Sequence, residues 1–195
     1  ILSLDRCNID YNQRTELIQK LFTKCSQLIE VNLNKGIGGC WGNELLLDPH
    51  LFSLIDNLTP NILKLDLSCQ KCLEDNHVKT LVQRCNKITE LELSYTSITN
   101  DSMESIIKHL NSLEKLDVSY TKIDYPTILE LKSIPTLKVL RCLEVGRKDA
   151  EKIKNLKLQL PHISINEEYL HIAKPSKVYV KDWFWEIRSK RQDLF

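Results

Sequence analysis

The chain is 195 residues long, with 27 basic and 26 acidic residues and a formal net charge of +1 at pH 7. This balance excludes a large field of one sign, so we expect no broad electrostatic capture of nucleic acid. No apolar run approaches the length of a membrane span, and the first residues lack the charged-then-apolar pattern of a secretory signal. We therefore expect neither nucleic acid nor membrane as a partner.

The seven cysteines are an odd number, which argues against a framework of disulfides. Cys25 and Cys85 each lie just before a predicted strand, at equivalent places in the pattern described below. This placement is typical of buried thiols that pack the end of a helix. We expect a reducing compartment, the nucleus and the cytoplasm.

Blocks of the form L-x-x-L-x-L recur along the chain, and each predicts a strand whose apolar residues share one face. After the end of a first block at Leu2–Leu4, they follow at residues 28–33, 62–67, 88–93, 113–118, 137–142 and 160–165. Counted between the middle apolar residues, from Leu2 to Ile163, the steps are 29, 34, 26, 25, 24 and 23 residues. Apart from the 34, these steps are typical of leucine-rich repeats.

Between the blocks the apolar spacing changes to three and four residues, which predicts helices. After Ser102 the apolar residues are Met103, Ile106, Ile107 and Leu110, and residues 43–58 supply the helix of the long step, with Pro49 near its start. The predicted fold is an α/β leucine-rich-repeat solenoid, an arc with a parallel concave sheet and convex helices. Residues 1–166 form about seven repeats, the first incomplete, and residues 167–195 form a C-terminal tail.

Motifs for catalysis or metal binding are weak. The glycines of residues 36–42 lack the Gly-Lys-Ser/Thr of a phosphate loop, and a longer loop explains them better. Cys69 and Cys72 form a lone C-x-x-C with only His77 nearby, whereas a structural zinc site needs four ligands. The five histidines share no spacing. We expect no enzyme activity, no metal and no cofactor.

The concave face of the sheet presents the polar residues that alternate with the leucines. Asp66, Glu92 and Asp117 should lie abreast on neighbouring strands about 4.8 Å apart, a row we call the acidic ladder. The complete set between the second and third apolar positions is Ser3, Asn32, Asp66, Glu92, Asp117, Arg141 and Ser164. Like charges abreast cost stability, and we expect Lys64 and Lys115, one residue before the second apolar position, to relieve part of that cost.

A second row follows the strands. It comprises Lys35, Cys69, Tyr95, Tyr120 and Leu143, so Tyr95 and Tyr120 should stand side by side. An exposed pair of tyrosines beside an acidic row favours a protein-binding surface over solvated strand positions, because tyrosine is enriched at interfaces.

The tail after Ile165 contains Trp183 and Trp185. A disordered tail is poor in aromatic residues, so we expect this one to pack, either as a cap on the last repeat or back across the concave face.

Several stretches resemble one family of proteins. The strand–helix repeat with a cysteine before the next strand is similar to the repeats of F-box proteins. "KTLVQRCNKITELELS", "PTILELKSIPTLKVL", "LPHISIN", "IAKPS" and "WEIRSKR" resemble, in the same order, the family of S-phase kinase-associated protein 2. The similarity runs from about Asn61 to Arg191. These proteins are substrate receptors of SCF-type ubiquitin ligases.

The resemblance implies that the tail folds back along the concave side and that a Cks-type subunit docks there. Together they would hold a phosphorylated Kip-type kinase inhibitor for ubiquitination. The family's Cks contacts map onto Lys71, Tyr95, Tyr120 and Lys122, and an aromatic contact of the tail maps onto Tyr169. The candidate partner-binding set is Asp66, Lys71, Glu92, Tyr95, Asp117, Tyr120, Lys122, Arg141, Tyr169, Trp183 and Trp185.

The chain departs from the family at two of these positions, where the family has Asp for Tyr95 and Arg for Tyr120. The sequence carries no F-box, so we expect it to reach the ubiquitin-ligase adaptor only through an F-box outside these residues. The alternative function is a leucine-rich-repeat scaffold that binds a protein partner without any link to ubiquitination.

Overall fold

The computed structural model describes residues 2–3, 20, 24, 27–34, 48–145 and 150–167. Within them, seven parallel strands form one sheet in chain order, each paired with the next. The strands are β1 (Leu2–Ser3), β2 (Glu30–Asn32), β3 (Lys64–Asp66), β4 (Glu90–Glu92), β5 (Lys115–Asp117), β6 (Val139–Arg141) and β7 (Ser164–Ile165). This arrangement confirms the predicted α/β leucine-rich-repeat fold.

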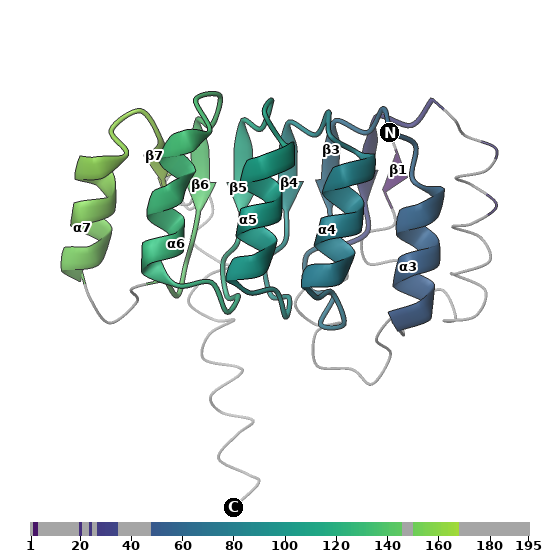
Figure 1. Cartoon of the computed structure of the whole chain (residues 1–195), viewed down its shortest axis with the longest axis horizontal. Helices are drawn as coiled ribbons and strands as arrows, with labels where there is room; N and C mark the ends of the chain where they lie inside the picture. Colours follow the sequence, from purple (N-terminus) through teal and green to yellow (C-terminus); the bar gives the residue numbers. More distant parts are fainter. Residues whose placement is uncertain are drawn as a thin grey trace, which may run out of the picture. The chain divides into compact units, whose positions relative to one another are not determined.

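A layer of helices covers one side of the sheet, and each helix runs antiparallel to the strands beside it (Figure 1). The helices are α3 (Asp48–Asn57), α4 (Asp75–Arg84), α5 (Asn100–His109), α6 (Tyr125–Leu129), the 3₁₀-helix η1 (Glu130–Ser133) and α7 (Ala150–Gln159). Pro49 lies in the first turn of α3, as predicted. None of the described helices is long and apolar enough to cross a membrane.

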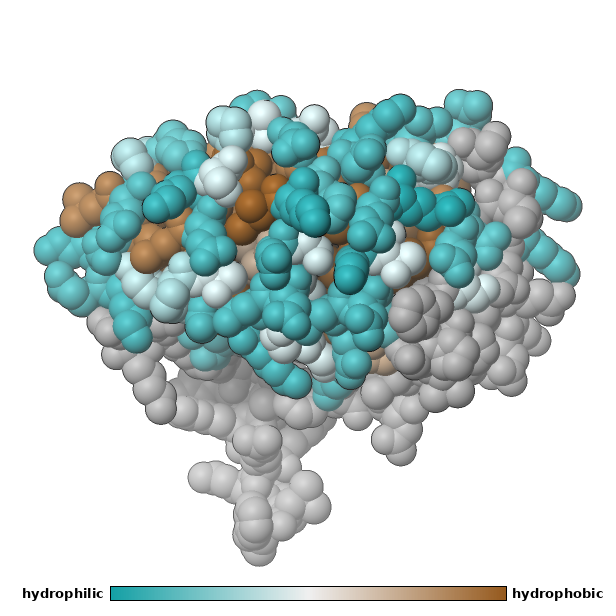
Figure 2. All heavy atoms as spheres, viewed as in Figure 1, coloured by the Kyte–Doolittle hydropathy of each residue, from teal (hydrophilic) through white to brown (hydrophobic). Residues whose placement is uncertain are grey.

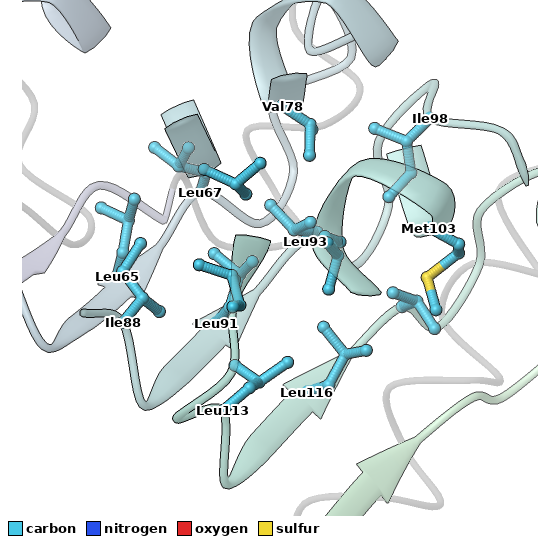
Figure 3. Packing of buried hydrophobic residues seen from close by; sticks show 14 of the residues in the cluster. Leu65, Leu67, Val78, Ile88, Leu91, Leu93, Ile98, Met103, Leu113 and Leu116 are labelled. Atoms are coloured by element: carbon cyan, nitrogen blue, oxygen red, sulfur yellow. The ribbon is translucent and has the colours of Figure 1, made fainter. Parts of the chain in front are cut away.

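The core lies between the sheet and the helices and runs through all the described repeats. Leu65, Leu91 and Leu116 stand abreast on β3, β4 and β5. Each is at most 2% exposed. Figure 3 shows these leucines pointing toward residues of the helical layer, among them Val78 and Met103. Each repeat buries its leucines mainly against its two neighbours, so stability depends on stacking.

Cys85 follows α4 and is fully buried, which confirms the predicted role of that cysteine at a helix end. Its Sγ lies 3.6 Å from the carbonyl oxygen of Thr59 in the preceding repeat. Burial raises the pKa of the thiol to about 11, so the group stays protonated and inert at neutral pH. Cys25 lies outside the described residues.

The register of the last strand differs from the prediction. Leu140 pairs with Ile165 rather than Ile163, and Val139 pairs with Ser164, so Ser164 does not stand abreast of Arg141. The reason is that the interval between the first and second apolar positions is one residue shorter in this repeat. The Ile163 N–H bonds to the Leu160 carbonyl, as the Leu137 N–H bonds to Ile134, so Ile163 occupies the first apolar position of its repeat.

The stacked core makes a direct prediction about stability. Leu91→Ala removes a fully buried side chain at the centre of the sheet and should lower the free energy of unfolding by about 2–5 kcal/mol. Leu158→Ala, at a side chain that is 71% exposed on α7, should change it by less than about 0.5 kcal/mol. Urea unfolding checks both, and equal effects would contradict this account of the core.

Candidate functional site: the concave face of the repeat sheet

The acidic ladder forms as predicted. Asp66 pairs with Glu92, and Glu92 pairs with Asp117, on three consecutive strands. The three residues differ in exposure, because Asp117 is buried whereas Asp66 and Glu92 are partly exposed. Their carboxylates also differ in their hydrogen-bond and ion-pair partners within the chain.

Two of the three carboxylates stabilise the turns that follow their strands. Oδ1 of Asp66 accepts a hydrogen bond from the N–H of Ser68 at 2.9 Å, and Oδ1 of Asp117 accepts one from Ser119 at 2.8 Å. Asn32 does the same for Asn34, two residues on, at 2.9 Å. A short oxygen-bearing side chain at this position therefore has a structural use in each turn. The sequence pattern alone did not reveal it.

Glu92 is the member of the ladder whose charge is least compensated. Burial is the main factor that raises its pKa, to about 7, and the neighbouring carboxylates Asp66, Asp117 and Glu90 add to this effect. Burial also raises the pKa of Asp117. Arg141 opposes both shifts, because its Nη1 lies 3.6 Å from Oε1 of Glu92 and 3.9 Å from Oδ2 of Asp117.

The two lysines form a separate row with Glu90. Nζ of Lys64 lies 2.8 Å from one carboxylate oxygen of Glu90, and Nζ of Lys115 lies 3.6 Å from the other. Burial tends to raise the pKa of Glu90, but the bond to Lys64 and the charges of both lysines outweigh it and lower that pKa. The lysines thus neutralise Glu90, and among the described residues Arg141 is the cation that approaches Glu92 and Asp117.

Tyr95 and Tyr120 stack, as the sequence predicted. Their ring centroids are 4.2 Å apart and their planes differ by 12°. Both residues are partly exposed. We call them the tyrosine pair.

The tyrosine pair occupies a turn position that is unusual for large residues. The backbone φ angle is 57° at both tyrosines, 66° at Cys69 and 80° at Glu144, all in the left-handed region. Glu144, not Leu143, therefore holds the equivalent position in the next repeat, four residues after the second apolar position. Counting this interval from Leu140 would have found it.

Lys71 and Lys122 are exposed in loops on either side of the loop that follows Tyr95. Ser97 Oγ donates to the Lys71 carbonyl at 2.6 Å, and the Lys122 N–H bonds to the Ile98 carbonyl at 3.0 Å. The structure thus brings the candidate residues of β3, β4, β5 and β6 onto one sheet and its adjoining loops. Tyr169, Trp183 and Trp185 lie outside the described residues, and their role stays a prediction.

Cys69 and Cys72 of the C-x-x-C motif lie in the turn and loop that follow β3. Cys69 is buried and lies in the turn after β3, and Nδ1 of His77 accepts a hydrogen bond from the Glu74 N–H at 3.2 Å in a capping interaction at the start of α4. No group of three or more His, Cys, Asp and Glu residues in the described part could hold a metal ion.

The charge of Glu92 predicts how stability depends on pH. The folded chain holds this proton up to about pH 7, whereas the ordinary value is 4.5, so stability should fall as the pH rises from about 4.5 to 7. Glu92→Gln should remove part of that fall and stabilise the chain by about 0.2–1 kcal/mol at about pH 8, because a like charge abreast is lost. Thermal unfolding at several pH values checks this.

The matched control is Glu104→Gln, at an exposed residue on the helical side. Hydrophilic residues cover much of this side, with hydrophobic residues visible between them (Figure 2). The control should keep the pH dependence of the parent. A Glu92→Gln chain that also keeps it would refute the assignment to Glu92.

Comparison with known proteins agrees with this geometry. A solved structure described as Leiomodin-1 Actin-Binding Site 2 is similar in fold, with a TM-score of 0.52 and 16% sequence identity, over 96% of this chain and 99% of that chain. Residues 3–192 match the family described as the SKP2 LRR domain. Leucine-rich repeats of this kind are generally non-catalytic, protein-binding modules. The chain belongs to the SKP2 LRR domain family.

Proposed function

We propose that this chain is the substrate-recognition module of an SCF-type ubiquitin ligase. It would recruit a phosphorylated cell-cycle inhibitor, with a Cks-type accessory subunit bound at the concave face. The observation that carries the proposal is the tyrosine pair, a stacked and partly exposed aromatic surface at the positions where the resemblance places Cks contacts and where the family itself has Asp and Arg. Membership of the SKP2 LRR domain family supports it.

The backbone at the tyrosine pair favours a binding role over a structural one. A left-handed conformation costs a non-glycine residue about 1 kcal/mol, and glycine or asparagine would fit the turn at lower cost. Tyr95 and Tyr120 both adopt this unfavourable conformation, on adjacent repeats. Their stacking stabilises the fold by about 0.5–1.5 kcal/mol. Rigid, partly exposed tyrosines are also frequent anchors of protein interfaces.

The proposal assigns no chemistry to the chain itself. The module would hold the substrate, and the ubiquitin-transferring components would be brought by the ligase adaptor through an F-box outside these residues. Lys71 and Lys122 would contact the Cks-type subunit beside the tyrosine pair. Arg141 would hold the side chains of Glu92 and Asp117 in place through its ion pairs. The tail, with Tyr169, Trp183 and Trp185, would contribute the remaining contacts to the partner. The proposed compartments are the nucleus and the cytoplasm.

Replacing the tyrosine pair should weaken partner binding. The double variant Tyr95→Ala with Tyr120→Ala removes the stacked pair. We expect affinity for a Cks-type subunit to fall about thirtyfold, since the pair, taken together as one interface anchor, is worth about 2 kcal/mol. Stability should change by only about 1 kcal/mol, because alanine bears a similar backbone cost and only the stacking is lost. Calorimetric titration and urea unfolding measure the two effects.

Tyr125→Ala serves as a control, because Tyr125 lies on the helical side, where its hydroxyl accepts a hydrogen bond from Asn155 at 2.6 Å. As long as this variant folds, it should bind the subunit like the parent. A version ending at Asn166, titrated in parallel, tells whether the tail contributes. Unchanged affinity in the double variant would remove the tyrosine pair from the proposal. If the folded parent chain does not bind the Cks-type subunit, the result would favour the alternative function, a repeat scaffold that binds a protein partner without any link to ubiquitination.

A further inference from the structure

The described concave positions carry an excess of acid, although the whole chain has a net charge of +1. On the outward positions of β2 to β6, five carboxylates lie beside three cations, an excess of two negative charges. The carboxylates are Glu30, Asp66, Glu90, Glu92 and Asp117, and the cations are Lys64, Lys115 and Arg141. Such a segregated charge selects partners of the opposite sign.

The acidic ladder already binds one guanidinium of the chain itself. At the β6 end of the acidic ladder, the guanidinium of Arg141 lies near both Glu92 and Asp117, with closest distances of 3.6 and 3.9 Å. At the β2 end, Asn32 stands abreast of Asp66 instead. An amide supplies no charge. Among the described residues, therefore, no cation stands abreast of Asp66 on β2, whereas Glu92 and Asp117 have Arg141 near them.

A hollow of about 150 Å³ adjoins this end of the ladder. Its lining includes Asp66, Glu90 and Glu92, together with Asn32 and Lys64. Lys64 is engaged with Glu90 at 2.8 Å. The hollow therefore combines concave shape with the carboxylate of Asp66 and with that of Glu92, which Arg141 only partly compensates.

We propose that this hollow receives an arginine side chain from an extended basic segment of the protein partner. The guanidinium would lie near Asp66 and Glu92, as that of Arg141 lies near Glu92 and Asp117. Arginine fits better than lysine, because its planar fork offers several N–H donors to two carboxylates at once. Tyr95, three residues after Glu92, adds an aromatic ring for a second cation. The inference rests on the proposed function only in using the same concave face.

Binding of this kind is linked to pH through Glu92. Burial chiefly, and the neighbours Asp66, Asp117 and Glu90 in addition, disfavour its ionised form. Arg141 favours that form, and the resulting pKa is about 7. An incoming arginine binds the ionised form better, so affinity should rise as the pH increases through about 7. A purely structural Glu92 would produce no such change in binding.

The test uses the full chain and synthetic peptides of about twelve residues that alternate arginine with serine, lysine with serine, or glutamate with serine. Fluorescence anisotropy should show the arginine peptide binding most tightly and the glutamate peptide not at all. Glu92→Gln should weaken arginine-peptide binding about tenfold and abolish the rise in affinity between about pH 6 and 8. Glu104→Gln, with the same charge change on the helical side, should stay within about twofold of the parent.

Asp66→Asn is a second variant that should preserve the fold, since Asn32 makes the equivalent turn bond in its own repeat. It should also weaken arginine-peptide binding about tenfold. Equal losses in the Glu92→Gln and Glu104→Gln chains, equal binding of the glutamate peptide, or no binding at all would overturn the proposal. The assay contains no Cks-type subunit, so its outcome is independent of the ubiquitin-ligase proposal.

Discussion

The register of the parallel sheet is the constraint on which the rest of this structure depends. Leu65, Leu91 and Leu116 can share one core only if each strand pairs in step with the next. The same register places equivalent residues of the opposite face side by side. Packing of leucines inside thus determines which charges and rings meet outside, about one strand spacing apart.

Two consequences of this register oppose each other. It brings Asp66, Glu92 and Asp117 abreast, which destabilises the sheet, and it brings Tyr95 and Tyr120 into a stack, which stabilises it. The chain limits the first cost with turn hydrogen bonds to the two aspartates and with Arg141. Glu92 has no such turn bond, and its pKa is raised by burial first and by the neighbouring carboxylates in addition. A surface with residual charge and strained tyrosines suits binding better than stability.

The apolar pattern was sufficient to predict the fold, because a two-residue period and a helical period alternate at repeat length. It also predicted the acidic ladder and the tyrosine pair, since in-step pairing follows from equivalent positions. It failed at β7, where the approach from Ile163 to Ile165 is one residue shorter than in the other repeats. The bonds of Asp66 and Asp117 to their turns, and the reach of Arg141 across two strands, depend on side-chain geometry that spacing does not encode.

The central claim is that the concave side, not the helical side, binds the partner. Amide hydrogen exchange of the intact chain, with and without a saturating Cks-type subunit, tests it most directly. The account predicts slower exchange in the loops at residues 68–73, 94–98 and 119–123, with α4 and α5 unchanged. Protection confined to the helices, or none in the presence of bound subunit, would contradict it.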